Sequence, residues 1–559
     1  MDGVVCRVHV LAAIMGRMEG ATPRRLRSDL WTLAIPLALG AFLRLWGLRW
    51  GLPDETHLFS YHPDEYHSLR AAIALATGDL NPHFFNYGSL YLYLVAVACL
   101  WHQTVLGGPD LISALVRGNR ADMEMAAWTL DARLVVVVCA LVTVYVAWLI
   151  GRRLAGTAGG LLAGLAMAAL PLHVLHSHYA TVDVPQALFM ALCLYLSLVA
   201  FDDPRPSRYL WAGIAAGLSA SVKYNGIVVL VAPLTVLVLS WRSGSSGLRP
   251  AKAFLVLGAG ALAAFALTSP YVFLSWPEAW RDISFELQHM RAGESPIKEL
   301  YPNGWLFHWH PSLVLGAIAL WVSARHDRRN LAPLAAFGLV WFAMIGAAGV
   351  RYARYEMALE PLTAVLVATA IVGLWRKPAK GLAWLGAGAL SLWCVAALLT
   401  SVQRDYTMAR VDPRAEMLAK LEAMRSETEP VGIVWEPWFN LPAVDYNNGG
   451  NVLRSNPIYS RFNRPAVDYT VTGVDAAKLA EDVRGVLISD FEMDDGFQSV
   501  SRDHKVFADK LWGEERTYRV AAGARPVAIG DHPLLGWTAP DSRYPFPRLT
   551  LLQRVPSRE

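Results

Sequence analysis

Apolar segments about 20 residues long recur through most of this chain, and they constrain its fold more than any other feature. A helix must have roughly this length to cross the hydrocarbon core of a bilayer. Only 17% of the 559 residues are charged, too few for the surface of a soluble protein of this size. The sequence therefore predicts a polytopic α-helical membrane protein. Twelve candidate segments lie at 31–50, 88–106, 132–150, 157–174, 184–201, 209–223, 226–241, 252–269, 310–325, 332–350, 355–374 and 380–402.

Charge and cysteine content exclude several other classes. The formal net charge is only +4, and the basic residues lie in short loops between apolar segments, which fits orientation in a membrane better than a nucleic-acid surface. No nucleic-acid partner is expected. The five cysteines show no paired spacing, so the sequence indicates neither a disulfide framework nor a thiolate metal site.

The basic loops also predict the topology, because cytoplasmic loops are enriched in Lys and Arg. Residues 1–30 are expected to form a cytoplasmic tail. All basic clusters fall on the inside if segment 88–106, which carries several aromatic side chains, lies in the membrane interface. About eleven helices then span the inner membrane and the C-terminus lies outside.

This topology divides the chain into a membrane domain at 31–402 and an extracytoplasmic domain at 403–559. Three loops, 51–131, 175–183 and 270–309, are expected on the outer face. After residue 401 charged residues, Pro, Asn and Gly return and apolar runs shorten, which predicts a soluble α/β domain. Its elements are expected to be a helix at 414–424 and strands at 431–435, 467–471, 486–489 and 549–553.

The run Tyr61 to His67, Tyr-His-Pro-Asp-Glu-Tyr-His, contains the first candidate site. Asp64 and Glu65 follow the first apolar segment, and acids at a membrane face are costly enough to suggest a function. Alternatively, they form an ordinary acidic first helical turn after Pro63. Adjacent carboxylates diverge on a helix, so only one of them can face a given cavity. We include His62 and Glu65 among the expected substrate-binding residues.

Asp183 is the second candidate acid, again at the outer end of an apolar segment. It precedes Pro185 and could simply cap a helix. Two acids from distant loops at one membrane face are also what a site with a catalytic base and an acceptor-binding group requires. We expect both Asp64 and Asp183 to be catalytic.

Basic residues near the same face are candidates for binding a phosphate. Arginine forks suit phosphate oxygens, and a lipid-linked substrate would present a phosphate at the membrane surface. The alternative is that each side chain extends to phospholipid head groups. The expected substrate-binding residues here are Lys223, Tyr224, Arg351, Arg354 and Tyr355.

Ten of the fifteen histidines fall in or beside the outer loops. Neutral imidazole and carboxylate together are a common set of ligands for divalent metals, so a divalent metal is a possible cofactor. No spacing identifies the ligands, and His289 is the leading candidate.

These motifs together resemble the GT-C superfamily of glycosyltransferases, of the protein O-mannosyltransferase and lipid A aminoarabinose transferase kind. The resemblance implies an inverting transfer at the non-cytoplasmic face of a sugar carried on a polyprenyl phosphate. It matches Asp64 to a first-loop catalytic aspartate, Asp183 to a second-loop acid and Arg354 to a donor-phosphate contact. The segments that carry it are 43–47, 62–65, 151–154, 180–185, 223–226 and 354–361.

The chemistry is consistent with this resemblance. An acceptor hydroxyl must lose a proton as it attacks carbon, and Asp64 could accept that proton as general base while Arg354 and Lys223 stabilise the departing phosphate. The alternative function is a transporter or flippase of a lipid-linked or anionic substrate, and a third is an inactive scaffold. A transporter is typically built from internal repeats and has charges near helix midplanes, and we find no repeat here. The sugar and the acceptor are not predicted.

Overall fold

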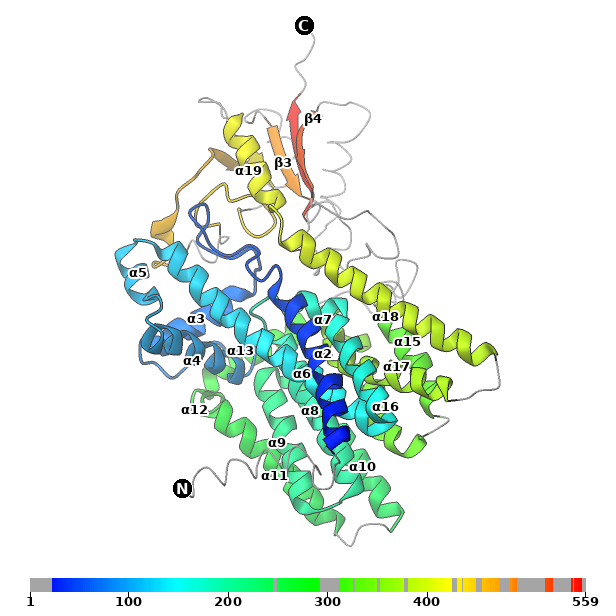
Figure 1. Ribbon diagram of the computed structural model, residues 1–559. Coiled ribbons are helices and arrows are strands. Elements are labelled where there is room, and N and C mark those ends of the chain that lie inside the picture. The colour runs from blue at the N-terminus through cyan, green and yellow to red at the C-terminus, as the bar shows by residue number, and fades with distance from the viewer. Residues whose placement is uncertain are drawn as a thin grey trace.

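The computed structural model describes residues 23–244, 249–291, 311–324, 327–348, 352–376, 381–424, 430–434, 436–448, 455–472, 483, 485–489, 518–525, 544–545 and 547–554. Most of them are helical (Figure 1). The α-helices are α2 (Pro23–Leu45), α3 (Glu65–Ala76), α4 (Leu90–Val105), α5 (Leu111–Arg117), α6 (Ala121–Ala169), α7 (Pro171–His176), α8 (Asp183–Asp202), α9 (Pro206–Val222), α10 (Val231–Arg242), α11 (Pro250–Thr268), α12 (Tyr271–Leu274), α13 (Trp276–His289), α15 (Pro311–Ala324), α16 (Arg328–Ala347), α17 (Glu360–Trp375), α18 (Gly381–Met408) and α19 (Pro413–Ala423), and the 3₁₀ helices are η1 (Tyr224–Leu230), η2 (Ala353–Leu359) and η3 (Ser460–Phe462).

The described helices confirm the predicted class of helical membrane protein. Among the described residues, seven helical segments are long and apolar enough to cross a bilayer. One of them, α6, has 49 residues and a non-helical backbone at Gly156 (φ 77°), between the predicted segments 132–150 and 157–174. The total of eleven spans remains a prediction.

The predicted outer loops contain helices of their own. α3, α4, α5 and the first turns of α6 lie within 51–131, and α12 and α13 lie within 270–309. Segment 88–106 forms α4, whose placement in the membrane interface remains a prediction.

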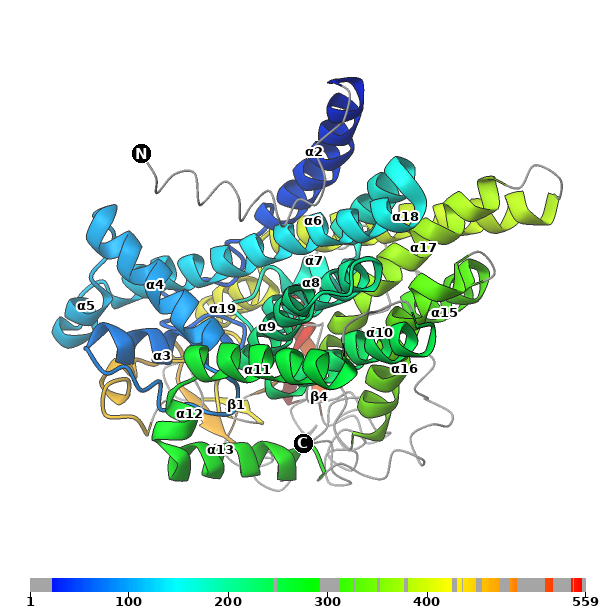
Figure 2. The ribbon, with the colours of Figure 1, turned by 90° about the horizontal axis from the view of Figure 1, so that it is seen from below.

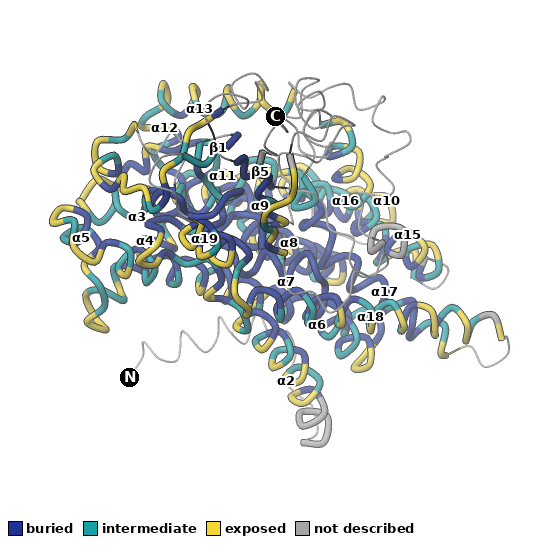
Figure 3. The backbone as a smooth tube through the Cα atoms, turned by 90° about the horizontal axis from the view of Figure 1, so that it is seen from above, coloured by how far each residue is buried: buried dark blue, intermediate teal, exposed yellow. Residues whose placement is uncertain are grey.

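Burial is highest in α6, α7, α8 and α17. Figure 3 shows α6, α7, α8 and α17 as the buried centre, whereas the ends of α2 and α18 project outward. A helix without a polar face must be surrounded by protein or lipid. Figure 2 shows α6 crossing the molecule from the side of α4 and α5 to the side of α18.

α9 and α11 pack closely because glycines line their contact. A Cβ atom at Gly213 would lie 2.1 Å from the carbonyl oxygen of Leu257, and one at Gly217 would lie 2.1 Å from that of Ala261. Small residues four positions apart are a common way for membrane helices to approach each other.

The described residues of the C-terminal part form a five-stranded sheet in the order β2-β1-β3-β5-β4. β1 pairs in parallel with β2 and β3, while β5 runs antiparallel to β3 and β4. α19 packs on the sheet through Met417, Leu418 and Leu421. This confirms the predicted helix and strands, and β4 was not predicted. The strands are β1 (Val431–Ile433), β2 (Tyr469–Val471), β3 (Gly485–Ser489), β4 (Tyr518–Ala524) and β5 (Leu549–Arg554).

The C-terminal part contacts the loop that follows α2. Trp50 Nε1 donates to Asp412 Oδ2 at 2.8 Å. The buried guanidinium of Arg414 lies over the Tyr61 ring at 4.6 Å and donates to the carbonyl oxygen of Tyr544. These contacts fix the sheet domain above the end of α2 (Figure 1).

Candidate functional site

Asp64 and Asp183 both lie where a helix begins. Asp64 immediately precedes α3 and Asp183 is the first residue of α8. The Asp64 side chain makes no capping hydrogen bond to the helix. At Asp183, the residue in the capping position is instead Val182.

Each of these two acids faces a basic side chain. Arg354 Nη2 lies 3.5 Å from Asp64 Oδ2, and Lys223 Nζ lies 2.9 Å from Asp183 Oδ1. Arg354 belongs to η2. Lys223 has an extended backbone and lies between α9 and η1. Four segments far apart in the sequence thus supply two acid–cation pairs.

The two pairs are neighbours. Lys223 exerts an electrostatic effect on Asp64, and Arg354 exerts one on Asp183. Tyr355 adjoins both, because it follows Arg354 in the chain and its ring lies 4.9 Å from Lys223 Nζ. The structure therefore brings together four of the charged residues that the sequence predicted.

Aromatic side chains complete the surroundings of Lys223. Its ammonium group lies 5.6 Å from the centre of the Tyr87 ring. The hydroxyl of Tyr224, a predicted substrate-binding residue, donates to the carbonyl oxygens of Phe85 and Tyr87 at 3.0 Å each. Tyr224 thereby holds the loop that carries Tyr87.

The two acids differ in exposure. Asp64 is partly buried, with 30% of its side-chain surface exposed, compared with 5% for Asp183. Burial of Asp64 opposes its ionisation, but the positive charge of Arg354 favours it, and the net effect holds the pKa of Asp64 below its ordinary value. Asp64 is therefore a carboxylate at neutral pH.

His62 supports the backbone at Asp64. Its Nδ1 accepts a hydrogen bond from the Asp64 amide at 3.2 Å, so the imidazole is neutral and its proton is on Nε2. Burial lowers the pKa of His62 to about 4, which is consistent with this neutral form. The ring also packs between Tyr179 and Tyr544.

Glu65 points to a different set of partners. Both carboxylate oxygens accept from Arg133 of α6, at 2.7 and 2.8 Å, and neither side chain is exposed. Glu65 also accepts from the amide of Ala180. Arg133 was not predicted, although an arginine inside an apolar segment requires a partner and was a usable signal.

Two predicted residues are not placed in this cluster. Arg351 lies outside the described residues. His289 is exposed at the end of α13. Among the described residues, no group of three or more His, Cys, Asp and Glu side chains is arranged to hold a metal ion, so a metal at His289 remains a prediction.

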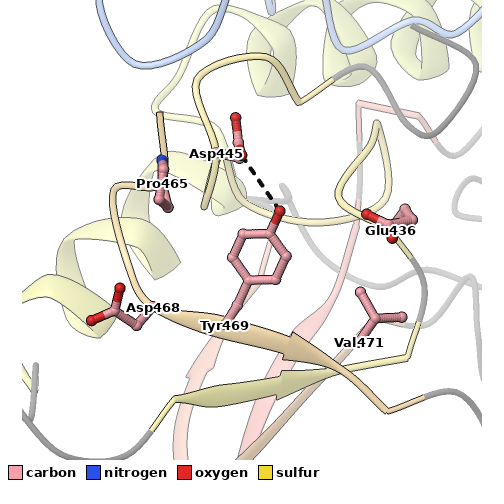
Figure 4. Close-up of a pocket in the computed structure, with 6 residues that line it drawn as sticks. All are labelled: Glu436, Asp445, Pro465, Asp468, Tyr469 and Val471. Atoms are coloured by element: carbon pink, nitrogen blue, oxygen red, sulfur yellow. Dashed lines mark hydrogen bonds between the residues drawn. The ribbon is translucent and has the colours of Figure 1, made fainter. Parts of the chain in front are cut away.

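A separate cavity of about 360 Å³ lies in the C-terminal domain (Figure 4). Tyr469 donates to Asp445 Oδ2 at 3.4 Å across it. None of the predicted site residues lines this cavity, whose lining consists of Glu436, Asp445, Pro465, Asp468, Tyr469 and Val471.

Comparison with known proteins identifies the fold. Residues 127–273, which run from α6 to α12, match the family of dolichyl-phosphate-mannose-protein mannosyltransferases. No curated protein matches the chain significantly in sequence. The archaeal oligosaccharyltransferase AglB from Archaeoglobus fulgidus, solved with an inhibitory peptide and a dolichol-phosphate, has a TM-score of 0.50 at 12% identity, covering 92% of this chain and 77% of AglB.

Two other solved structures are similar over different lengths. ArnT from Cupriavidus metallidurans bound to undecaprenyl phosphate has a TM-score of 0.46 at 15% identity and covers 94% of this chain and 98% of ArnT. The match to the S. cerevisiae protein O-mannosyltransferase Pmt1-Pmt2 complex covers 45% of this chain and 34% of the matched chain of the complex, with a TM-score of 0.34 at 18% identity. The likeness to AglB shows that the chain has the fold of the GT-C superfamily of membrane glycosyltransferases, which its sequence resembles, and the apolar helices show an integral membrane protein.

Proposed function

We propose that this protein transfers a sugar from a polyprenyl-phosphate donor to a hydroxyl acceptor at the extracytoplasmic face of the inner membrane, with inversion at the anomeric carbon. The observation that carries the proposal is the pair of neighbouring acid–cation contacts, Asp64 with Arg354 and Asp183 with Lys223. Such a cluster offers both a base and two positive charges for a phosphate.

Asp64 is the general base in this proposal. The acceptor oxygen attacks the anomeric carbon, its proton moves to Asp64, and the bond from that carbon to the phosphate oxygen breaks with its electron pair. Asp64 suits this role better than Asp183 because it is ionised, more exposed and less tightly paired. Asp183 supports the acceptor or a metal ion.

Arg354 and Lys223 hold the phosphate. Negative charge grows on the phosphate oxygen as the donor bond breaks, and fixed cations in a partly buried site stabilise that charge more effectively than water does. Both side chains are mostly buried, at 11% and 14% exposure. Tyr224 and Tyr355 shape the surroundings of Lys223, and His62 fixes the backbone at Asp64.

A lipid-linked donor is further supported by the family match and by the fold. The matched family is named for a dolichyl-phosphate sugar, and AglB, which has the same fold, was solved with dolichol-phosphate. The basic clusters of the sequence fall in the loops predicted to be cytoplasmic, and this supports an extracytoplasmic orientation of the site.

The proposal is tested with purified protein and a panel of labelled polyprenyl-phosphate sugars, in which donor consumption is measured with and without membrane extract as the source of acceptor. We expect consumption of at least one donor, release of free polyprenyl phosphate and loss of both in Asp64→Asn. Transport of an intact labelled donor across vesicles, without cleavage, would instead support a flippase.

A further inference from the structure

Three buried side chains join the segments that lead to the site, and the proposed mechanism does not use them. Arg44 lies at the end of α2, His173 in α7 and Glu360 at the start of α17. All three are at most 3% exposed. We call this group the α2–α7–α17 junction.

Two hydrogen bonds link the three residues of the junction in series. Arg44 Nη2 donates to His173 Nδ1 at 3.0 Å, and the backbone amide of His173 donates to Glu360 Oε2 at 3.0 Å. Arg44 Nη1 also donates to the carbonyl oxygen of Ala168, at the end of α6. One arginine and one carboxyl group therefore fix α7 from two sides.

The three joined segments are the ones that carry the proposed site residues. α2 leads into the loop that ends at Asp64, and α7 leads through Tyr179 to Asp183. η2, which carries Arg354, ends directly before Glu360. A shift of α7 against its neighbours would therefore change the positions of Asp64, Asp183 and Arg354 relative to each other.

Packing alone would not require charged residues here. Apolar side chains of similar volume are often as stabilising as a buried charged group, because the charged group loses its hydration. A directional hydrogen bond differs from an apolar contact in fixing one register between the segments that it joins.

We propose that Arg44, His173 and Glu360 are positioning residues, and that the α2–α7–α17 junction holds Asp64, Asp183 and Arg354 in the arrangement required for sugar transfer. This inference rests on the proposed function, since it assigns a role within the same site. In this proposal the three residues act through the segments that they join and not on the reacting atoms.

The first test compares two substitutions of His173. His173→Asn keeps an acceptor for Arg44, because the amide Oδ1 can take the place of Nδ1, whereas His173→Leu has a similar volume and no acceptor. We expect His173→Asn to keep kcat within about 3-fold of wild type and His173→Leu to lower kcat at least about 10-fold, with a smaller change in donor KM. Equal activity of the two variants, high or low, would overturn the proposal.

A second measurement does not depend on turnover. Cysteines are introduced by Asp64→Cys and Arg354→Cys, and a short bifunctional thiol reagent cross-links them, with the single-cysteine variants as controls. The yield of cross-link, measured by mass spectrometry, should be unchanged by His173→Asn and reduced at least about 3-fold by His173→Leu. An unchanged yield in His173→Leu refutes the positioning role. A changed yield in a protein that consumes no donor supports positioning and refutes the proposed function.

A matched pair of variants at Glu360 serves as a second test if a substitution of His173 prevents folding. Glu360→Gln keeps an oxygen that accepts the His173 amide proton, and Glu360→Leu does not. If His173→Leu cannot be purified, the same two measurements are made on this pair, with the same expectations. If Glu360→Leu also fails to accumulate as a monodisperse protein, the junction is needed for folding itself and the positioning proposal is overturned.

Discussion

Glu65 and Arg133 form a two-pronged ion pair with no solvent exposure, one residue away from the partly open Asp64. Arg133 also donates to the carbonyl oxygens of Leu48 and Trp50, so the pair ties α3 and α6 to the loop after α2. Two adjacent acids thus have different surroundings. Glu65 anchors the helix start from which Asp64 faces Arg354.

Breaking this ion pair should destabilise the protein. Arg133→Leu leaves the Glu65 carboxylate buried without its partner, which typically costs about 3–5 kcal/mol. We expect a clear fall in the melting temperature measured in detergent. The double variant Glu65→Leu/Arg133→Leu should recover much of the loss, because no charge then remains buried alone. A double variant no more stable than the single one would contradict this account.

Asp64→Asn should abolish transfer while leaving the fold intact. The amide has the same size but cannot accept the acceptor proton, and loss of a general base typically lowers a rate by about 100-fold or more. Donor consumption and the melting temperature are measured together. The control is Glu55→Gln, which neutralises an exposed acid in the same loop and should change neither.

Arg354→Ala should weaken donor binding. A hydrogen bond to a charged group contributes about 1.5–3 kcal/mol, so we expect donor KM to rise by roughly 10- to 100-fold. Arg354→Lys should retain part of the affinity because it keeps the charge but loses the planar fork. Arg49→Ala removes an exposed arginine close to the site loop and should leave donor KM unchanged.

The pH profile should reveal the electrostatic effect of Arg354 on Asp64. Because the pKa of Asp64 is depressed, kcat/KM should stay constant from neutral pH down to values below the ordinary aspartate pKa and then fall as Asp64 is protonated. Replacement by Arg354→Gln leaves burial as the main influence, which raises the pKa. The acidic limb should then move to higher pH. If kcat/KM falls at the same acidic pH in both proteins, the fall is not caused by protonation of Asp64.

The close contact of α9 and α11 should tolerate no added methyl group. Gly213→Ala places a Cβ atom 2.1 Å from the carbonyl oxygen of Leu257, which forces the helices apart and should cost about 1–3 kcal/mol. Gly258→Ala is the matched control, because its Cβ atom would meet no other atom within 4 Å. Only the first substitution should lower the melting temperature.

Several parts of the fold could be predicted because their physical cause is local. The length of an apolar run indicates a membrane helix, and short apolar runs between polar residues predicted four strands. β4 escaped prediction because its sequence, Tyr-Arg-Val-Ala-Ala-Gly-Ala, has only one strongly apolar aliphatic residue. α13 was missed, although Glu278, Asp282 and Glu286 recur every four residues and contact the loop at 81–86.

The candidate site was predictable in its residue types but not in its pairing. The cost of acids and bases at a membrane face singled out Asp64, Asp183, Lys223 and Arg354. Which acid meets which base depends on how four distant segments pack, and a single sequence does not contain that information. The different surroundings of Asp64 and Glu65 have the same origin, since Arg133 comes from another helix.

The contacts of Trp50 and Tyr61 with Asp412 and Arg414 bear on how this protein can be dissected. Truncation after α18 would remove these contacts from the rings of Trp50 and Tyr61. The loop that leads to Asp64 would then lose its packing against the C-terminal domain. The helical part is therefore a poor choice for expression by itself, and chimaeras with proteins of the same fold should exchange the loop after α2 and the C-terminal sheet domain as a unit.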